Sequence, residues 1–297
     1  MVSILTGATF QHWITKHDSF IFDCDGVLWN SGKRLPGIKK LLNLLNKEKK
    51  QTFYLTNNST KHFKQFRSEF EKYEFPFLDK QQLLTPTTLL SPLIDTIPNF
   101  DRTKDKIFAV GEKPFFNTMK EFGLNVVTAE DHGDPIDLFF GKKVKLDEKV
   151  KIAIIGWDRH FSWSKSALLS LYLYNRPDVT FLATNPDASF PFGKLQFPGT
   201  GSLVRMVEHA TGRKAKIIGK PEVTSFEVIQ RVLKKKGLVV DKKRVCMIGD
   251  RIDTDLKFAE NVGISSCCVG TGISNIEDLE KTDIKIDYWV DNFGDFF

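Results

Sequence analysis

The sequence predicts an α/β protein built on a parallel sheet, because short β-type runs alternate along the chain with longer segments of helical periodicity. The run Phe20 to Phe22, for example, is followed by a helical segment at residues 36–50 and then by TFYLT at residues 52–56. Strictly alternating units of this kind place helices on both faces of a parallel sheet, as in Rossmann-like folds. Further β-type runs occupy residues 106–111, 151–156, 179–185, 215–219, 244–249 and 265–270.

The helical segments are predicted by the spacing of their apolar residues. Soon after Pro36, four apolar residues follow the i, i+3, i+4, i+7 spacing of an amphipathic helix: Ile38, Leu41, Leu42 and Leu45. Three other segments have helical patterns, and they lie at residues 63–70, 162–174 and 222–236. Each of them separates two β-type runs, as a crossover between parallel strands requires.

The composition is that of a globular protein, and it excludes several classes of partner. Of the 297 residues, 41% are apolar and 27% are charged, and no apolar run approaches the roughly 20 residues that cross a bilayer. We therefore expect no membrane partner. The net charge of +6 includes short basic runs near the ends of helical segments, with no basic stripe interleaved with aromatic residues. We expect no nucleic-acid partner either.

The cysteines and the amino-terminal residues predict the compartment. The four cysteines have neither metal-ligand spacing nor the pattern of a disulfide framework. No basic residue precedes Lys16 and no long apolar core is present there, so the amino terminus does not resemble a secretory signal. We expect a reduced, cytoplasmic protein.

Two aspartates end the first β-type run, and they are the first candidates for catalysis or metal binding. Asp23 and Asp25 point the same way because side chains alternate along a strand, and Gly26 then turns the chain. Two carboxylates in a shared site repel each other unless a cation lies between them. A pair of aspartates before a glycine is also a common turn, so this motif alone leaves both interpretations open.

Polar residues also follow three other β-type runs. Asp250 comes directly after RVCMIG, and Asp255 lies near the start of the next helix. Thr56 ends TFYLT, and Lys220 follows AKIIG. Because ligands of open parallel sheets bind at the carboxyl ends of the strands, we expect these groups to meet in one pocket. Carboxylates gathered in this way suit Mg²⁺, which would make the first aspartate pair tolerable.

Four motifs in this order resemble those of the haloacid dehalogenase-like hydrolases: DCDGVLW, LTNNST, GKP and GDRIDTD. The resemblance extends from about residue 18 to the end, and it is strongest to the subfamily of 4-nitrophenyl phosphatases, phosphoglycolate phosphatase and pyridoxal phosphatase. It implies a Mg²⁺-dependent phosphatase that acts through an aspartyl-phosphate.

The resemblance also implies a role for each motif residue. Asp23 would be the nucleophile, and Asp25 would protonate the leaving oxygen and then accept a proton from the attacking water. Mg²⁺ would be held by Asp23, the main-chain carbonyl of Asp25, Asp250 and Asp255. The phosphoryl group would be bound by Thr56, Asn57, Asn58 and Lys220.

The resemblance implies two domains. Residues 1–92 and 198–297 would form the catalytic core, and residues 93–197 would form an inserted α/β cap of the C2 type that covers the active site. The stretch between Asn58 and Lys220 is far longer than a single crossover needs. A large cap favours small phosphoesters over macromolecular substrates, and relatives associate through it, so we expect a homodimer.

The expected substrate is 2-phosphoglycolate, with hydrolysis of 4-nitrophenyl phosphate in vitro. Its carboxylate would be recognised by cap residues, for which the candidates are Arg159, Asn185 and Asp187. The alternative is a pyridoxal 5′-phosphate or broad-specificity phosphatase, in which an aromatic ring stacks on the substrate (Trp157, Phe190 or Phe192). An inactive scaffold protein is the third possibility, and the intact motifs argue against it. Transfer of the phosphoryl group to acceptors other than water stays open.

Overall fold

The structure is a computed structural model that describes residues 2–132, 144–192 and 195–297. The chain forms two compact units. The first comprises Met1–Thr56, Phe63–Thr85 and Lys220–Phe297, and the second comprises Asn57–His62 and Pro86–Gly219. The second unit includes all of residues 93–197, the predicted cap, and extends beyond them at both ends.

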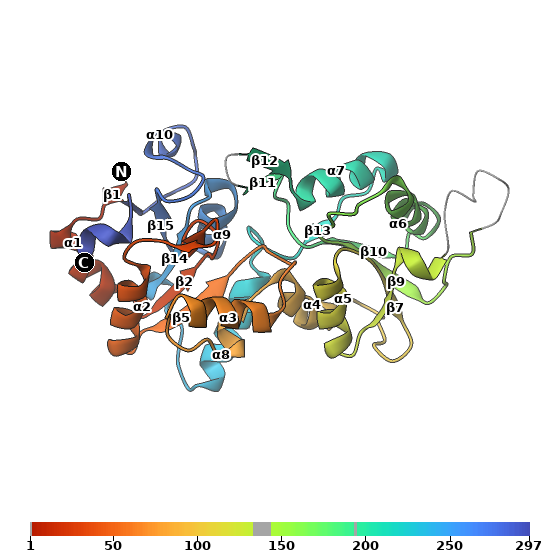
Figure 1. The fold of residues 1–297 in the computed structure, drawn as a ribbon. Helices are drawn as coiled ribbons and strands as arrows, with labels where there is room; N and C mark the ends of the chain where they lie inside the picture. Colours follow the sequence, from red (N-terminus) through yellow and green to blue (C-terminus); the bar gives the residue numbers. More distant parts are fainter. Residues whose placement is uncertain (1, 133–143, 193–194) are drawn as a thin grey trace. The chain divides into compact units, whose positions relative to one another are not determined.

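The first unit is built on a seven-stranded sheet whose strands are all parallel, which confirms the predicted fold class (Figure 1). The strand β2 (Ser19–Phe22) lies inside this sheet between β14 (Val245–Gly249) and β5 (Gln51–Leu55). The remaining strands are β15 (Ser265–Val269), β16 (Tyr288–Val290) and β1 (Ser3–Ile4) beyond β14, and β6 (Leu83–Leu84) beyond β5.

The other elements of the first unit are helices, single helical turns and one hairpin. The α-helices are α1 (Gly7–Lys16), α2 (Ile38–Lys47), α3 (Phe63–Lys72), α8 (Thr224–Lys235), α9 (Lys257–Val262) and α10 (Ile276–Leu279). Shorter helical turns occupy Lys80–Gln82, Lys242–Arg244, Ile252–Leu256 and Phe293–Phe296. The hairpin consists of β3 (Trp29–Asn30) and β4 (Lys33–Arg34).

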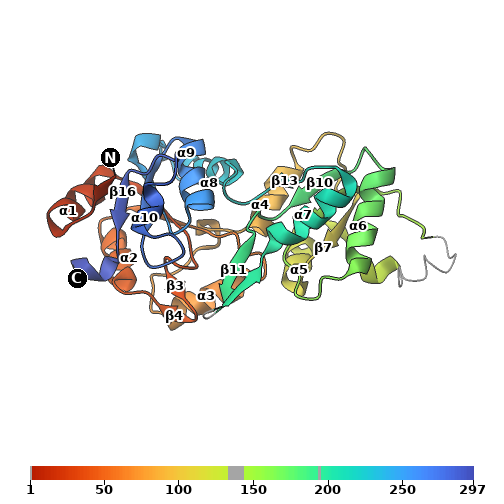
Figure 2. The same cartoon turned by 90° about the horizontal axis from the view of Figure 1, so that it is seen from above.

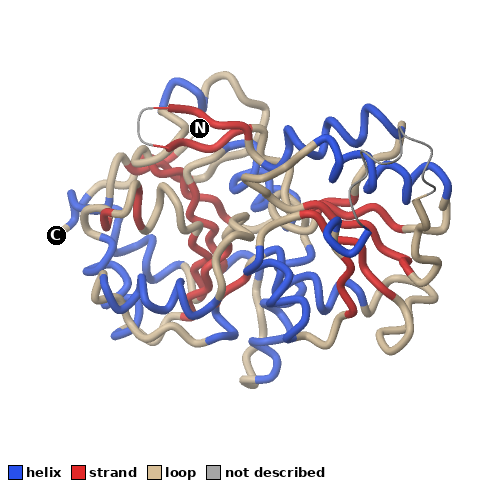
Figure 3. The backbone as a smooth tube through the Cα atoms, turned by 45° about the vertical axis from the view of Figure 1, so that its right-hand side comes forward, coloured by secondary structure: helices blue, strands red, loops and turns tan. Residues whose placement is uncertain are grey.

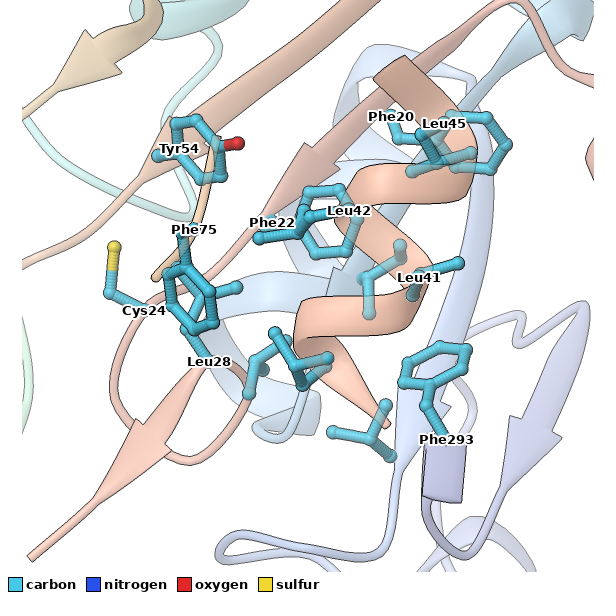
Figure 4. Close-up of a cluster of buried hydrophobic side chains, with 14 of the residues drawn as sticks. Phe20, Phe22, Cys24, Leu28, Leu41, Leu42, Leu45, Tyr54, Phe75 and Phe293 are labelled. Carbon is cyan, nitrogen blue, oxygen red and sulfur yellow. The ribbon is translucent and has the colours of Figure 1, made fainter. Parts of the chain in front are cut away.

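The core of the first unit explains why β2 can end in charged residues. Every residue of β2 is buried, and Phe20 and Phe22 share one apolar cluster with the inner face of α2 (Figure 4). That face carries Leu41 and Leu45 at the predicted helical spacing. A fully buried central strand fixes the backbone direction, so the residue after Phe22 emerges at a defined point at the carboxyl edge of the sheet.

The second unit has a sheet of its own, separate from that of the first unit (Figure 3). This sheet has five strands, and all of them are parallel. Its strands, in spatial order, are β13 (Lys216–Ile217), β10 (Thr180–Ala183), β9 (Val150–Ile155), β7 (Lys106–Val110) and β8 (Asn125–Val127). Its helices are α4 (Pro86–Ile94), α5 (Lys113–Glu121), α6 (Trp163–Asn175) and α7 (Thr200–Thr211), with a short turn at Ala129–His132. The strands β11 (Ser189–Phe192) and β12 (Leu195–Pro198) pair with each other antiparallel.

The strand before Lys220 lies in this second sheet, whereas the predicted boundary at residue 197 assigns it to the core. β13 pairs in parallel with β10, with Lys216 opposite Leu182. An apolar run predicts a strand but does not say which strand it pairs with, so the sequence did not distinguish the two sheets.

Within the described ranges, no helix has the length and apolar character needed to span a bilayer.

His17, directly after α1, is fully buried in the first unit. Its Nδ1 lies 2.9 Å from the carbonyl oxygen of Trp13, so Nδ1 carries the hydrogen. Within the described residues, Nε2 has no hydrogen-bond partner. Burial lowers the pKa of His17, and the positive charges of Lys16 and Arg244 lower it further.

We expect acid to destabilise the protein through His17. Its pKa in the folded protein is below the value of about 6.5 in the unfolded chain, so the unfolded chain binds the extra proton. The stabilisation is complete above about pH 6.5 and is lost as the pH falls, by at most about 1.4 kcal/mol per pH unit. Urea unfolding near pH 7.5 and pH 5.5 should show a smaller pH effect for His17→Phe than for the wild type. The exposed His209 provides the control His209→Gln, and an equal pH effect in all three proteins would contradict the assignment.

Candidate active site

Asp23 lies where the sequence predicts it, directly after the central strand β2. Its backbone N–H donates to the carbonyl oxygen of Ile248 in β14 at 2.9 Å, which extends the pairing of the two strands by one residue. Asp23 is only 7% exposed. A carboxylate this deeply buried needs cations or hydrogen-bond donors around it.

Asp250 and Asp255 are brought to the same place by the neighbouring strand. Asp250 follows the last residue of β14, and Asp255 lies in the helical turn Ile252–Leu256. Together with Asp23, each offers a carboxylate oxygen, and the three oxygens lie within 4.8 Å of one another. One oxygen of Asp255, Oδ2, accepts from the backbone N–H groups of Asp250 and Arg251, both at 3.1 Å. These bonds hold Asp255 in position.

Lys220 is the cation among these carboxylates, although its side chain is only 2% exposed. Its Nζ contacts Oδ1 of Asp23 and lies 2.6 Å from Oδ1 of Asp255. It also donates to the carbonyl oxygen of Leu55, the last residue of β5, at 2.9 Å. Lys220 therefore joins three segments that are far apart in the sequence.

The pKa shifts of these groups follow from burial and from mutual repulsion. Burial raises the pKa of Asp23 well above its ordinary value, opposed by Lys220 and reinforced by Asp255 and Asp250. Burial and the charge of Asp255 raise the pKa of Asp250 to about 7. Burial alone would lower the pKa of Lys220, but its two carboxylate partners outweigh burial and raise it. One ammonium thus leaves three buried carboxylates incompletely neutralised.

The three carboxylates fit a small divalent cation. Oδ2 of Asp250 accepts from the N–H of Ile273 at 2.9 Å, but its Oδ1 is buried and has no hydrogen-bond partner among the described residues. Gly26 and Gly272 both pack on this carboxylate, and a Cβ at Gly272 would come within 1.9 Å of its Oδ2. Only oxygen ligands are offered, as Mg²⁺ prefers, and the unpaired oxygen is the type of ligand that an ion requires.

Asp25 differs from these three aspartates because it is exposed. Its carboxylate is not among the three that lie together. The metal contact through its main-chain carbonyl stays a prediction. Its Oδ1 accepts a hydrogen bond of 2.9 Å from the indole Nε1 of Trp29. Trp29 is the last residue of the motif DCDGVLW, and no role was predicted for it from the sequence.

The residues of the second motif are divided between the units. Thr56 is buried at the end of β5, and its N–H donates to the carbonyl oxygen of Leu84 at 3.1 Å. Asn57 and Asn58 belong to the second unit. The carboxamide oxygen of Asn58 accepts from the backbone N–H of Thr60 at 2.9 Å, as in a turn. Phosphate binding by these residues stays a prediction.

The three predicted cap residues all have partners within the second unit. Arg159 is exposed and forms a two-bond ion pair with Glu112, at 2.6 and 3.0 Å. Asn185 is buried, and its Nδ2 donates to the carbonyl oxygen of Asn57 at 3.0 Å. Asp187 accepts from Nδ2 of Asn57 at 3.3 Å. Asn185 and Asp187 thus bind the second motif itself, and their role in selecting a substrate stays a prediction.

Family models match one segment in each half of the chain. Residues 20–125 match a model described as haloacid dehalogenase-like hydrolase, and residues 217–296 match a model described as HAD-hydrolase-like. These two segments contain the four predicted motifs.

Whole proteins with similar sequences and structures carry the names of phosphatases. Phosphoglycolate phosphatase 1A of Arabidopsis thaliana is 30% identical over 95% of this chain and 77% of its own length. The 4-nitrophenylphosphatase of Schizosaccharomyces pombe is 30% identical over 96% of this chain and 95% of its own. A 4-nitrophenylphosphatase of Thermotoga maritima has a similar structure, with a TM-score of 0.78, 26% identity, and coverage of 96% of this chain and 97% of that one.

Proposed function

This chain belongs to the haloacid dehalogenase-like hydrolases as a phosphomonoesterase, and from that premise we propose that it is a Mg²⁺-dependent phosphatase acting on small phosphoesters. The observation that carries the proposal is the buried group of Asp23, Asp250, Asp255 and Lys220. It combines a nucleophile, a set of hard oxygen ligands and a fixed positive charge. Positioning and charge neutralisation supply most of the acceleration in phosphoryl transfer.

The first step forms a bond between a carboxylate oxygen of Asp23 and phosphorus. The bond between phosphorus and the leaving oxygen breaks, and that oxygen takes the proton of Asp25 to become an alcohol. Lys220 offsets the charge of the nucleophile, and Thr56 binds a phosphoryl oxygen. Bound to Asp23, Asp250, Asp255 and the main-chain carbonyl of Asp25, Mg²⁺ would supply the remaining charge neutralisation.

The second step regenerates the protein. Water attacks phosphorus and gives its proton to the carboxylate of Asp25. The bond between phosphorus and the oxygen of Asp23 breaks, so inorganic phosphate leaves and the Asp23 carboxylate is restored.

We propose 2-phosphoglycolate as the substrate, because a relative named phosphoglycolate phosphatase is 30% identical to this chain over most of the length of both chains. Residues 93–197 would act as the cap, and the protein would associate through it as a homodimer. A pyridoxal 5′-phosphate phosphatase is the second candidate, favoured by an aromatic pair in the second unit. The rings of Trp157 and Phe190 meet edge to face at 5.4 Å, and Arg159 lies over the ring of Trp157. The side chain of Phe192 lies outside the described part of the structure.

Phosphate release from 2-phosphoglycolate, pyridoxal 5′-phosphate and 4-nitrophenyl phosphate tests the proposal. We expect turnover that disappears after chelation and returns with Mg²⁺, because three buried carboxylates need the ion. The ratios of kcat/KM distinguish the two candidate substrates. A carboxylate-binding cap discriminates steeply against uncharged analogues, whereas stacking tolerates them. No release from any of the three compounds, with the metal present, would overturn the proposed function.

A further inference from the structure

The indole N–H of Trp29 is bonded to the carboxylate of Asp25, and neither of the two reaction steps uses this contact. We propose that Trp29 is a positioning residue that fixes the Asp25 carboxyl group and selects Oδ2 as the oxygen that delivers the proton. The inference rests on the proposed function, in which Asp25 protonates the leaving oxygen. It assigns Trp29 no contact with the substrate.

The indole ring of Trp29 is tightly packed, so the position and direction of its N–H group are fixed. The residue is only 3% exposed. Four rings surround it with centroids between 5.8 and 6.5 Å from its own: Phe66 and Phe70 of α3, Tyr73 and Phe75. Figure 2 shows the β3–β4 hairpin, which Trp29 begins, near α3. Aromatic packing of this kind restricts the indole to one orientation.

The backbone between Asp25 and Trp29 is also fixed. The N–H of Gly26 donates to the carbonyl oxygen of Trp29 at 2.8 Å, and Asp25 and Trp29 form an isolated bridge. Oγ1 of Thr271 donates to the carbonyl oxygen of Gly26 at 2.7 Å, which ties the loop to the segment after β15. The indole and the carboxylate thus belong to one short loop whose backbone is held by hydrogen bonds.

The hydrogen bond from Trp29 decides how Asp25 carries a proton. Indole Nε1–H is a donor only, so the oxygen that faces it must accept. That oxygen is Oδ1, at 2.9 Å. When the carboxyl group is protonated, the hydrogen therefore lies on Oδ2, which is free to point at the leaving oxygen. An exposed carboxylate without such a donor samples several rotamers, and the loss of that freedom is what positions a proton donor.

Replacing Trp29 with phenylalanine tests the inference, because it removes the donor and keeps an aromatic ring. An alkyl leaving group needs the proton of Asp25, whereas 4-nitrophenolate leaves as a stable anion. We expect kcat/KM for 2-phosphoglycolate to fall about tenfold, which is a fraction of the roughly 10²–10⁴-fold acceleration that a general acid supplies. We expect kcat/KM for 4-nitrophenyl phosphate to change less than about twofold. The matched control is Trp289→Phe, which removes an indole–carboxylate bond of 2.8 Å to Asp291 and should leave the ratio unchanged.

Two further variants separate the possible outcomes. In an Asp25→Asn background, Trp29→Phe should have no additional effect on the alkyl ester, because the two residues act as one unit. If Trp29→Phe fails to fold, benzothienylalanine at position 29 replaces the N–H with sulfur in a ring of the same shape. An unchanged substrate ratio in a folded Trp29→Phe variant, with Asp25→Asn strongly slowed but still measurable on the alkyl ester, overturns the role of Trp29 alone. Full activity of Asp25→Asn would instead overturn the proposed function.

Discussion

Asp23→Asn should abolish turnover and at the same time make the metal-free protein more stable. An asparagine cannot form the aspartyl-phosphate, and loss of a nucleophile typically costs at least about 10⁴-fold in kcat. Phosphate release with Mg²⁺ present measures the first effect. The control is Asp253→Asn, an exposed aspartate near the site that pairs with Arg251 and should keep wild-type turnover.

The gain in stability follows from the raised pKa of Asp23. A carboxyl group whose pKa is higher in the folded than in the unfolded protein destabilises the fold when ionised. This cost is absent below about pH 3.8 and grows as the pH rises through the folded pKa, so it is present at neutral pH. A neutral side chain of the same shape removes it, and thermal unfolding without metal should show a higher midpoint. Turnover within tenfold of the wild type would contradict the assignment of Asp23 as the nucleophile. A lower unfolding midpoint would contradict the view that ionised Asp23 destabilises the metal-free protein.

Lys220→Met should destabilise the protein and remove its activity. Lys220 is buried between Asp23 and Asp255, so its loss leaves two buried carboxylates without their cation. Breaking a buried ion pair by removing one partner costs about 3–5 kcal/mol. Urea unfolding of the metal-free protein measures this loss directly.

The chain offers a matched control for that variant. Lys165 lies 2.7 Å from the buried carboxylate of Asp158 in the second unit, but it is more exposed than Lys220, and among the described residues it forms an ion pair with one carboxylate rather than two. Lys165→Met should therefore cost less stability and leave kcat unchanged. Adding Asp255→Asn to Lys220→Met removes one orphaned charge and should recover part of the lost stability. A stability loss for Lys220→Met no larger than that for Lys165→Met would contradict the view that Lys220 neutralises the buried carboxylates of Asp23 and Asp255.

The strands next to the catalytic aspartates were predictable because they are buried and short. The runs before Asp23 and Asp250 are continuous apolar segments, which is typical of central parallel strands, and both form within a residue of the predicted bounds. The order of polar residues at the strand ends predicted that the groups following these strands would meet in one pocket. Asp23, Asp250, Asp255 and Lys220 do meet, whereas the carboxylate of Asp25 is not among them.

The remaining features depend on pairing, which a local pattern does not encode. The edge strands β1 and β6 have only two residues each, too few for a periodicity. The membership of β13 in the second sheet is decided by its contact with β10. Trp29 looks like an ordinary core residue in the sequence, since its bond to Asp25 depends on the loop between them.

The parallel topology also sets the time at which the site can assemble during synthesis. Lys220 lies 197 residues after Asp23, and β14, which pairs with β2, is made later still. At about 5–20 residues per second, roughly 10 to 40 seconds pass before the nucleophile meets its cation on the ribosome. Throughout that interval β2 is an apolar strand with at least one edge unpaired, the type of segment that aggregates. Nascent chains that stall between β5 and β14 should therefore be the ones that chaperones bind.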